Sequence, residues 1–163
     1  GSADDLSAQA GFAWADEGLH FRFVVKDDVQ AEGPSAAELW RGDSIQLALS
    51  RALPYAAKED NYLEVGFALQ DDRPLLYMWQ TPREMNAAKL VQASRLSITR
   101  KGDSTVYEGM LAVADWLDLR SGAQFGLSFI VNENDGAGRE GWLEWGGGIG
   151  YHKSPADFGY AAL

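Results

Sequence analysis

Apolar and polar residues alternate along much of this chain, and a period of two indicates extended strands rather than helices. Leu19, Phe21, Phe23 and Val25 occupy alternate positions, which places them on one face of a strand. Nine further segments have strand character and are separated by clusters of Gly, Pro, Asp and Asn: residues 7–14, 44–49, 62–69, 75–79, 91–100, 105–113, 125–132, 141–145 and 158–163. This series predicts an all-β fold, an antiparallel β-sandwich of two sheets with about ten strands.

Helical signals are confined to two short segments, residues 35–40 and residues 114–119. Neither segment is long enough for an independent helix, so we expect one or two short helical turns. The length of 163 residues fits one domain. We interpret Gly1 and Ser2 as a remnant of cloning, and residues 3–163 as a single domain cut from a longer protein.

Charge and residue usage argue against several classes of function. Lys and Arg total 14 and Asp and Glu total 24, which gives a net charge of −10. Nucleic acids and anionic membranes attract cationic surfaces, so we expect neither as a partner. The chain has no cysteine, which excludes disulfides, thiolate metal sites and a cysteine nucleophile. No apolar run approaches the ~18 residues that a membrane-spanning helix needs.

Tryptophan gives the clearest indication of a binding site. Trp40 follows a polar loop, and Trp142 and Trp145 lie just before a glycine-rich loop. Alternation predicts that Trp142 and Glu144 share one strand face and that Trp145 lies on the other. Exposed indoles beside polar side chains are typical of saccharide recognition, because sugar C–H faces stack on indole and hydroxyls need hydrogen-bond partners. Two other tryptophans lie in hydrophobic runs and are expected in the core: Trp14 and Trp116.

Carboxylates leave an enzymatic alternative open. Glu64, Glu108 and Glu144 each lie on a predicted strand, and a facing pair of carboxylates is what glycoside hydrolysis requires. His20 and His152 have no second His and no Cys at ligand spacing, and His20 is expected to face solvent. Recognisable catalytic motifs are otherwise missing, and we expect a protein that is not an enzyme.

Oxygen-rich loops favour a calcium site. Asp28 ends a predicted strand, Asp43 follows a glycine, and residues 132–136 form an Asn-Glu-Asn-Asp-Gly loop. Calcium takes roughly six to eight oxygen ligands from loops of this kind. The alternative is ordinary turn chemistry, in which Asn and Asp side chains accept hydrogen bonds from backbone N–H groups.

Several short motifs together resemble a known family. They are FVVKDDV at residues 23–29, LWRGDSIQL at residues 39–47, TVYE at residues 105–108, FGLSFIVN at residues 125–132, and the closing FG at residues 158–159. Their order and spacing resemble carbohydrate-binding module family 9 and the wider DOMON-like group. The resemblance runs from about Leu19 to Leu163.

The resemblance implies a β-sandwich that binds a sugar between two tryptophans without catalysis. Trp40 and Trp145 match the positions of this clamp. Gln46 stands where the family usually has a carboxylate that contacts sugar hydroxyls. Glu64 and Gly66 stand where the family has an Arg and an Asn that point into the site.

The resemblance also has implications for position 142 and for metal binding. Trp142 occupies a position that is Asn in some members, so the polar lining of the site differs from theirs. Family members carry structural calcium, which implies Asp28 and Asp43 as candidate ligands. No organic cofactor is expected.

We therefore expect a non-catalytic carbohydrate-binding module that stacks a saccharide unit between tryptophans. It would target a parent polysaccharide-degrading enzyme in the same chain to its substrate, outside the cell or in the periplasm. Gln46 and Glu64 would bind sugar hydroxyls, with Trp142, Glu144 or Arg41 contributing. Besides the enzymatic alternative, two others stay open: a non-binding structural domain of a large glycoside hydrolase or lyase, and a haem-binding DOMON-like domain with His or Met axial ligands.

Overall fold

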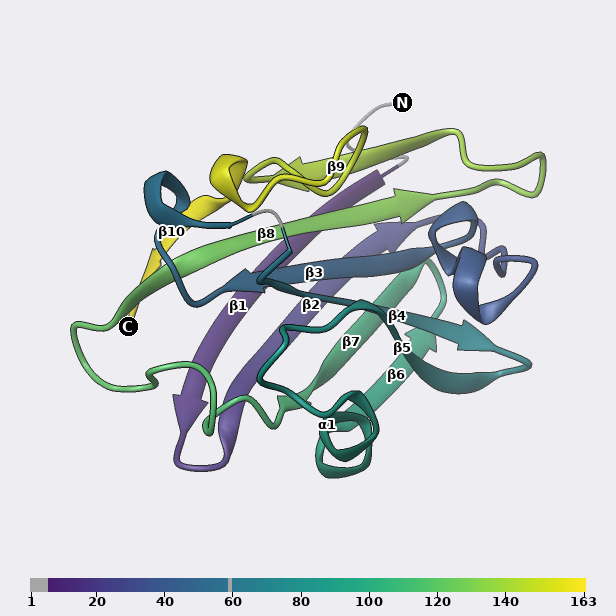
Figure 1. Cartoon of the computed structure of the whole chain (residues 1–163). Coiled ribbons are helices and arrows are strands. Elements are labelled where there is room, and N and C mark those ends of the chain that lie inside the picture. The colour runs from purple at the N-terminus through teal and green to yellow at the C-terminus, as the bar shows by residue number, and fades with distance from the viewer. Residues whose placement is uncertain (1–5, 59) are drawn as a thin grey trace.

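The computed structural model describes residues 6–58 and 60–163, so Gly1 and Ser2 lie outside the described residues. Ten strands form two antiparallel sheets in this part of the chain, which confirms the predicted β-sandwich. In Figure 1 the larger sheet faces the viewer, and the smaller sheet runs behind it at an angle.

The smaller sheet contains four strands in the order β1-β2-β7-β6, and the larger contains six, in the order β10-β8-β3-β4-β5 with β9 also paired to β8. The bounds in the smaller sheet are β1 Leu6–Ala15, β2 Gly18–Asp27, β6 Arg95–Lys101 and β7 Ser104–Leu111. The bounds in the larger sheet are β3 Ser44–Ser50, β4 Leu63–Gln70, β5 Arg73–Gln80, β8 Gln124–Glu133, β9 Gly141–Trp145 and β10 Gly159–Ala162.

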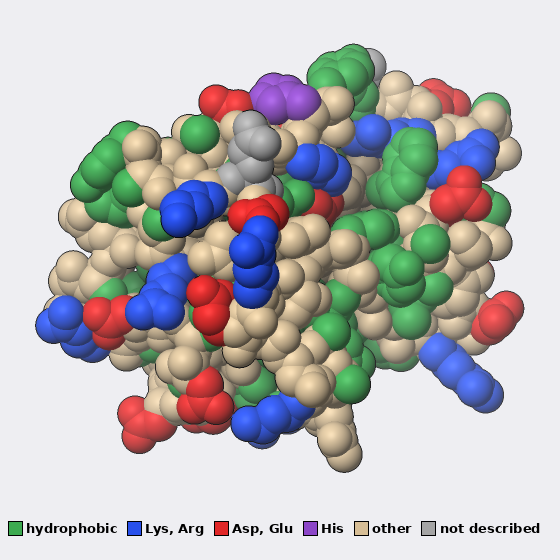
Figure 2. Space-filling view, in the orientation of Figure 1, with side chains coloured by type: hydrophobic (Ala, Val, Ile, Leu, Met, Phe, Trp, Pro, Cys, Tyr) green, Lys and Arg blue, Asp and Glu red, His purple; other side chains and the backbone are tan. Residues whose placement is uncertain are grey.

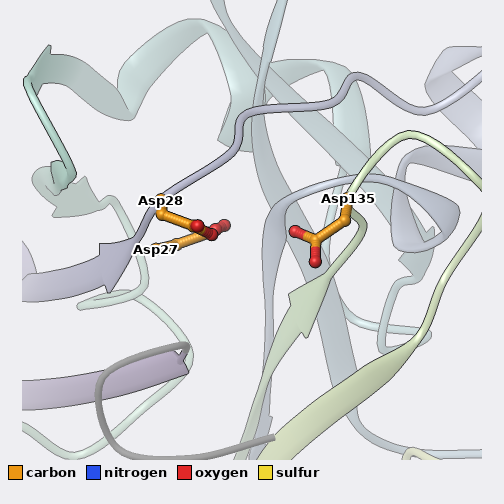
Figure 3. A group of neighbouring side chains, drawn as sticks. All are labelled: Asp27, Asp28 and Asp135. Atoms are coloured by element: carbon orange, nitrogen blue, oxygen red, sulfur yellow. The ribbon is translucent and has the colours of Figure 1, made fainter.

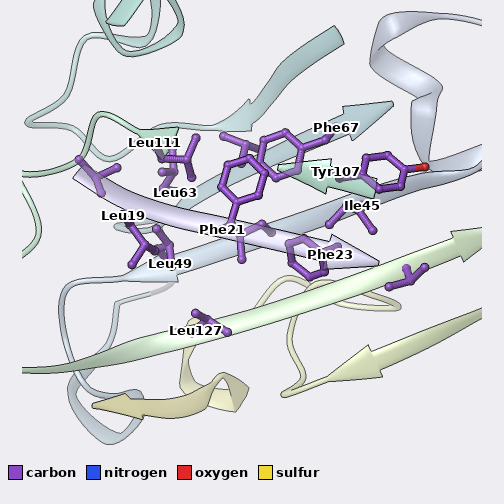
Figure 4. Close-up of a cluster of buried hydrophobic side chains, with 14 of the residues drawn as sticks. Leu19, Phe21, Phe23, Ile45, Leu49, Leu63, Phe67, Tyr107, Leu111 and Leu127 are labelled. Carbon is purple, nitrogen blue, oxygen red and sulfur yellow. The ribbon is translucent and has the colours of Figure 1, made fainter. Parts of the chain in front are cut away.

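The alternation explains why each sheet has an apolar inner face. Along β2, Phe21 and Phe23 are buried, whereas Arg22 between them is exposed. The inner side chains of the two sheets meet in one cluster (Figure 4). Phe21 of the smaller sheet stacks on Phe67 of β4, with ring centroids 4.5 Å apart and planes 11° apart. Burial of these inner faces is the main contribution to stability.

Helical structure in the described residues is limited to one short α-helix and three 3-10 turns: α1 Ala87–Ala93, η1 Ala36–Arg41, η2 Pro54–Ala56 and η3 Pro155–Asp157. The helical turn predicted over residues 35–40 is confirmed as η1, whereas residues 114–119 form turns without a helix. None of the helices in the described residues has the length and hydrophobicity to cross a membrane.

The strand predicted over residues 91–100 is wrong in its first part. Asn86 caps α1, because its side-chain oxygen accepts a hydrogen bond from the backbone N–H of Lys89 at 3.0 Å. Leu90 is the buried residue of this helix, and strand β6 begins only at Arg95. The periodicity of a short apolar run does not distinguish a helix from a strand. The Asn86 cap therefore favours a helix in a segment whose pattern also fits a strand.

Of the two tryptophans expected in the core, only one is buried. Trp116 is buried, as predicted. Trp14 is 41% exposed, so that prediction is wrong. Trp14 lies on β1, an edge strand of the smaller sheet, and lines a groove together with residues of the larger sheet.

Candidate functional site

A row of buried polar side chains crosses the outer face of the larger sheet. Gln46, Glu64 and Asn132 come from β3, β4 and β8, and they project outward because Ile45 and Val65 beside them point into the core. They are only 6%, 1% and 1% exposed, respectively. Asn132 Nδ2 donates to Gln46 Oε1 at 3.2 Å, and Gln46 Nε2 donates to Glu64 Oε1 at 3.2 Å. These hydrogen bonds hold the polar groups in fixed orientations.

Lys153 forms an ion pair with the buried Glu64 carboxylate. Its Nζ donates to Glu64 Oε1 at 2.5 Å and to the backbone oxygen of Ile149 at 2.9 Å. Lys153 reaches Glu64 from the loop between β9 and η3. An unpaired buried carboxylate is costly, so the contact with Lys153 offsets the cost of burying Glu64 and holds its side chain in place.

A pocket of about 320 Å³ opens over these polar side chains. Gln46 and Glu64 form its polar floor, and Trp40, Trp79 and the loop residues contribute to its walls. This volume is within the range of small-molecule sites, ~300–1,000 Å³. Figure 2 shows this face of the molecule, with basic and hydrophobic side chains lying next to one another in its upper part. The pocket therefore combines apolar walls with fixed hydrogen-bonding groups.

Two tryptophans from separate elements line the pocket. Trp40 lies on η1 and is 37% exposed. Trp79 lies on β5, and its indole Nε1 donates to the backbone oxygen of Ala37 at 2.9 Å. This hydrogen bond ties Trp79 to the turn that carries Trp40, so the two indoles are positioned together.

Gly66 makes room for Trp79, and this gives a testable prediction. A Cβ atom on Gly66 would lie 2.5 Å from the Trp79 ring and 2.7 Å from Leu39. We expect Gly66→Ala to displace the Trp79 ring, to weaken ligand binding about tenfold and to lower the free energy of unfolding by about 1–3 kcal/mol. Tryptophan fluorescence, calorimetric titration and chemical denaturation measure the three effects.

Gly11→Ala is the control for this prediction. A Cβ atom at Gly11 has no heavy atom within 4 Å, so this variant should change neither the fluorescence nor the binding. Unaltered binding by Gly66→Ala would show that Trp79 is not part of the ligand site.

Arg139 lies between two indoles at the rim of the pocket. Its Cζ is 4.2 Å from the centroid of the Trp142 ring and 5.8 Å from that of Trp40. Burial lowers the pKa of Arg139 from its usual value, while nearby Tyr151 and Glu144 act in the opposite direction. A guanidinium over indole faces forms a cation–π interaction, which holds the side chain against the pocket wall.

The comparisons with known proteins agree with this geometry. The family model described as "carbohydrate family 9 binding domain-like" matches residues 1–163. The chain belongs to this family. Among solved structures, the chain is similar to a carbohydrate-binding module family 9 (CBM9) domain from Caldicellulosiruptor kristjanssonii in complex with cellotriose. The TM-score is 0.75, the identity is 20%, and the match covers 97% of this chain and 75% of that one.

A second structure of a CBM9 domain from Caldicellulosiruptor kristjanssonii, in complex with glucose, gives a TM-score of 0.74 at 19% identity. This match covers 97% of this chain and 76% of that chain. At this level of identity the structures show a shared fold. A search of curated proteins finds no match.

The structure does not bring together the two tryptophans that the CBM9 resemblance implied as a clamp. Trp145 pairs in register with Phe129 of β8 and stacks on its ring, with centroids 5.8 Å apart. It lines a separate groove of about 420 Å³ at the open edge of the sandwich, with Trp14 and Tyr160. Trp40 lines the pocket over Gln46 instead. The two indoles therefore do not face each other across one slot.

Three other residues were predicted for the CBM9 site: Trp142, Glu144 and Arg41. Trp142 and Glu144 lie on the β9 face opposite Trp145, as the alternation predicted, because they pair with Asn132 and Ile130. Glu144 approaches the pocket-lining Gly150, and Trp142 packs beneath Arg139. Arg41 binds Glu38 through Nη1 at 3.1 Å and is not among the residues that line the pocket.

Of the carboxylates in the hydrolase alternative, Glu108 is separated from the other two, because Glu64 and Glu144 both lie on strands of the larger sheet. Glu108 lies on β7 of the smaller sheet and pairs with Arg22 at 3.5 Å. Both residues line a larger, shallow hollow of about 590 Å³ on the outer face of that sheet, together with His20. Glu64 lies on the larger sheet, in contact with Lys153. The fold therefore does not pair Glu108 with Glu64.

A group of three carboxylates could hold a metal ion at one end of the sandwich. Asp27 and Asp28 at the end of β2 and Asp135 after β8 place carboxylate oxygens within 4.8 Å of one another. Figure 3 shows Asp135 directed toward the other two residues. Burial raises the pKa of Asp27, and Asp135 contributes by repulsion. Clustered carboxylate oxygens fit a hard divalent cation, which would neutralise this repulsion.

Asp43 lies outside this group of three and connects two loops. Its Oδ2 accepts the N–H of Ala31 at 2.5 Å, and its Oδ1 accepts the N–H of Asn134 at 2.8 Å. Burial raises the pKa of Asp43 to about 7, and repulsion from Asp27 adds to this effect. Asp43 thus holds together the segments that follow Asp28 and precede Asp135.

The pocket is also lined by Trp79, Arg139 and Lys153, which were not predicted from the sequence as parts of this site. Trp79 lies two residues after Tyr77 on the same strand. The alternation of side chains along a strand could therefore have placed the Trp79 side chain on the outer face of the larger sheet. Arg139 and Lys153 lie in loops, where no periodicity indicates direction. Their positions follow from the hydrogen bonds and ring contacts that the fold creates.

Proposed function

We propose that this CBM9-family domain is a non-catalytic carbohydrate-binding module that holds one saccharide unit in the pocket over Gln46 and Glu64. The observation that carries the proposal is the partly exposed indole of Trp40 beside hydrogen-bonded, fixed polar groups. Such a surface matches a pyranose ring, which has apolar C–H faces and a rim of hydroxyls. The related CBM9 structures with cellotriose and glucose support the same ligand class.

In the proposed mechanism, the sugar ring lies against Trp40 and Trp79 while its hydroxyls bind Gln46 and Glu64. Each ring contact contributes about 1–3 kcal/mol by apolar burial, and each bond to a charged group about 1.5–3 kcal/mol. After the cost of association is subtracted, these contacts correspond to a Kd of roughly micromolar to millimolar magnitude. The floor groups are already held in place, so little ordering accompanies binding.

We further propose that the domain targets a parent enzyme to a polysaccharide. Weak binding by an accessory domain raises the local concentration of a linked catalytic domain at its substrate. The polysaccharides that such enzymes degrade lie outside the cell, so we infer an extracellular or periplasmic location for the whole protein. Deleting the domain from the parent enzyme should reduce activity on insoluble polysaccharide and leave activity on soluble oligosaccharides unchanged.

Calorimetric titration with a panel of neutral and acidic oligosaccharides tests the binding function. We expect saturable binding to at least one member with a Kd in roughly the micromolar to millimolar range. Failure to bind any glycan of a broad array would contradict the proposal and favour a structural accessory domain. Release of reducing sugars by the isolated domain would contradict its non-catalytic character.

We also propose that Asp27, Asp28 and Asp135 hold a structural calcium ion. The ion would join the end of β2 to the loop after β8, and backbone oxygens or water would complete its coordination. Its function would be to stabilise the loop that carries Arg139, since Asp135 and Arg139 belong to the same loop between β8 and β9.

Adding calcium to protein treated with a chelator is expected to raise the Tm. Calcium at about 100 times its Kd stabilises the folded state by about 2.7 kcal/mol, which corresponds to several degrees. Asp135→Asn should abolish this shift, whereas Asp115→Asn, at an exposed carboxylate outside the group, should retain it. A Tm that is independent of millimolar calcium would count against the site.

A further inference from the structure

One wall of the pocket carries two basic side chains, Arg139 and Lys153, from the loops that flank β9. Lys153 is already committed to the Glu64 carboxylate and to the Ile149 carbonyl. The negative charge of the floor is therefore balanced without Arg139. The residues that line the pocket carry two positive charges and one negative charge, and Glu144 lies next to this lining at Gly150. The chain as a whole has a net charge of −10.

The hydrogen-bonding groups of Arg139 are incompletely used. Its Nε and Nη2 are shielded from solvent and have no hydrogen-bond partner among the described residues. Glu144 attracts Arg139 electrostatically without forming a hydrogen bond to these atoms. Leaving such donors unpaired costs free energy, so a ligand that supplies acceptors gains more here than at a hydrated arginine.

The two unpaired donor atoms of Arg139, Nε and Nη2, indicate which hydrogen-bond acceptor fits this site. Nε–H and Nη2–H lie on one edge of the guanidinium and point in parallel, so they match the two oxygens of a carboxylate in bidentate fashion. A single hydroxyl satisfies only one of them. Both atoms are shielded from solvent, and the guanidinium lies next to the indoles of Trp40 and Trp142, so its edge must turn toward the pocket when it binds a carboxylate.

We propose that this pocket selects a sugar that carries a carboxylate, that is, a uronic acid unit. Arg139 binds the carboxylate through Nε and Nη2 while the pyranose ring lies against Trp40 and Trp79. The inference rests on the proposed saccharide-binding function and specifies its substrate class. A single uronate is favoured over a long polyanion, because the acidic surface repels a highly charged chain.

The test compares uronates with their neutral parents by calorimetric titration. The methyl glycosides of glucuronic, galacturonic and mannuronic acid are each paired with the corresponding methyl hexoside, which differs only at C6. We expect at least one uronate to bind about tenfold more tightly than its neutral parent, equivalent to about 1.4 kcal/mol. Raising the salt concentration should reduce this preference, because it depends on charge.

Arg139→Gln is the decisive variant, and it should reduce the uronate preference to about twofold or less. Arg139→Lys keeps the charge and loses the bidentate edge, so it should retain only part of the preference. Arg120→Gln removes the same charge outside the pocket, from an exposed arginine paired with Asp118, and should leave the preference intact. Retained affinity for the neutral hexoside shows that the Arg139→Gln pocket is still folded.

Each remaining outcome is informative. Equal binding of neutral and acidic sugars by the unaltered domain overturns the uronate inference and leaves the saccharide-binding function standing. Tighter binding of all sugars by Arg139→Gln also overturns it, because Arg139 would then merely occupy the space of the sugar ring. Absence of binding to every sugar overturns the saccharide-binding function itself.

Discussion

Replacing Trp40 with alanine is expected to remove measurable saccharide binding, whereas the same substitution at Trp145 leaves binding unchanged. Trp40 lines the pocket over Gln46 and Glu64, and Trp145 lines the groove at the sandwich edge. Loss of one ring contact costs about 1–3 kcal/mol, which weakens binding by about tenfold or more. For a ligand that binds weakly, this places the Kd beyond the reach of calorimetry.

The two substitutions are matched controls for each other. Trp40 and Trp145 are 37% and 43% exposed, so each variant removes a similar amount of partly exposed apolar surface. The Tm values of both variants should stay within a few degrees of the unaltered domain. Loss of binding in Trp145→Ala with full binding in Trp40→Ala would move the saccharide site to the edge groove and contradict our assignment.

Phe67→Ala is expected to lower the free energy of unfolding by about 3–5 kcal/mol. Phe67 is fully buried, and its ring stacks on Phe21 of the opposite sheet, so truncation leaves a cavity between the two layers. Denaturation with guanidinium chloride measures the loss, which corresponds to a Tm lowered by about 10 °C.

Val91→Ala provides the comparison for this core substitution. Val91 is 41% exposed on α1, so its truncation should change stability by less than about 0.5 kcal/mol. A loss below about 1 kcal/mol in Phe67→Ala would show that the two sheets are less tightly packed at this point than the structure indicates.

The sandwich could be predicted from the sequence because its determinants are local. Strands β2, β3 and β4 alternate strictly, and Gly-, Asp- and Pro-rich turns separate the elements. The boundary between α1 and β6 could not be predicted in the same way. There the Asn86 cap and the burial of Leu90 decide in favour of a helix, and neither is visible in the alternation of residues 91–100.

The candidate site could be predicted only in part. Gln46 and Glu64 lie on strands, so alternation and the family resemblance together identified two residues that do line one pocket. The same alternation separated Trp142 from Trp145 but did not say which of them faces the core. That depends on the pairing of Trp145 with Phe129, a contact between β9 and β8 that no local pattern specifies.

The pocket has a floor built from strands and a basic wall built from loops. Arg139 of this wall can change in evolution without affecting the floor, whereas Lys153 is coupled to the floor through its ion pair with Glu64. Gln46 and Glu64 are fixed by backbone pairing within β3 and β4. The segments that carry Arg139 and Lys153 connect strands at the rim, where substitutions leave the sheet hydrogen bonds intact. A lineage could therefore acquire a new glycan preference through a few loop substitutions while keeping the same folded scaffold.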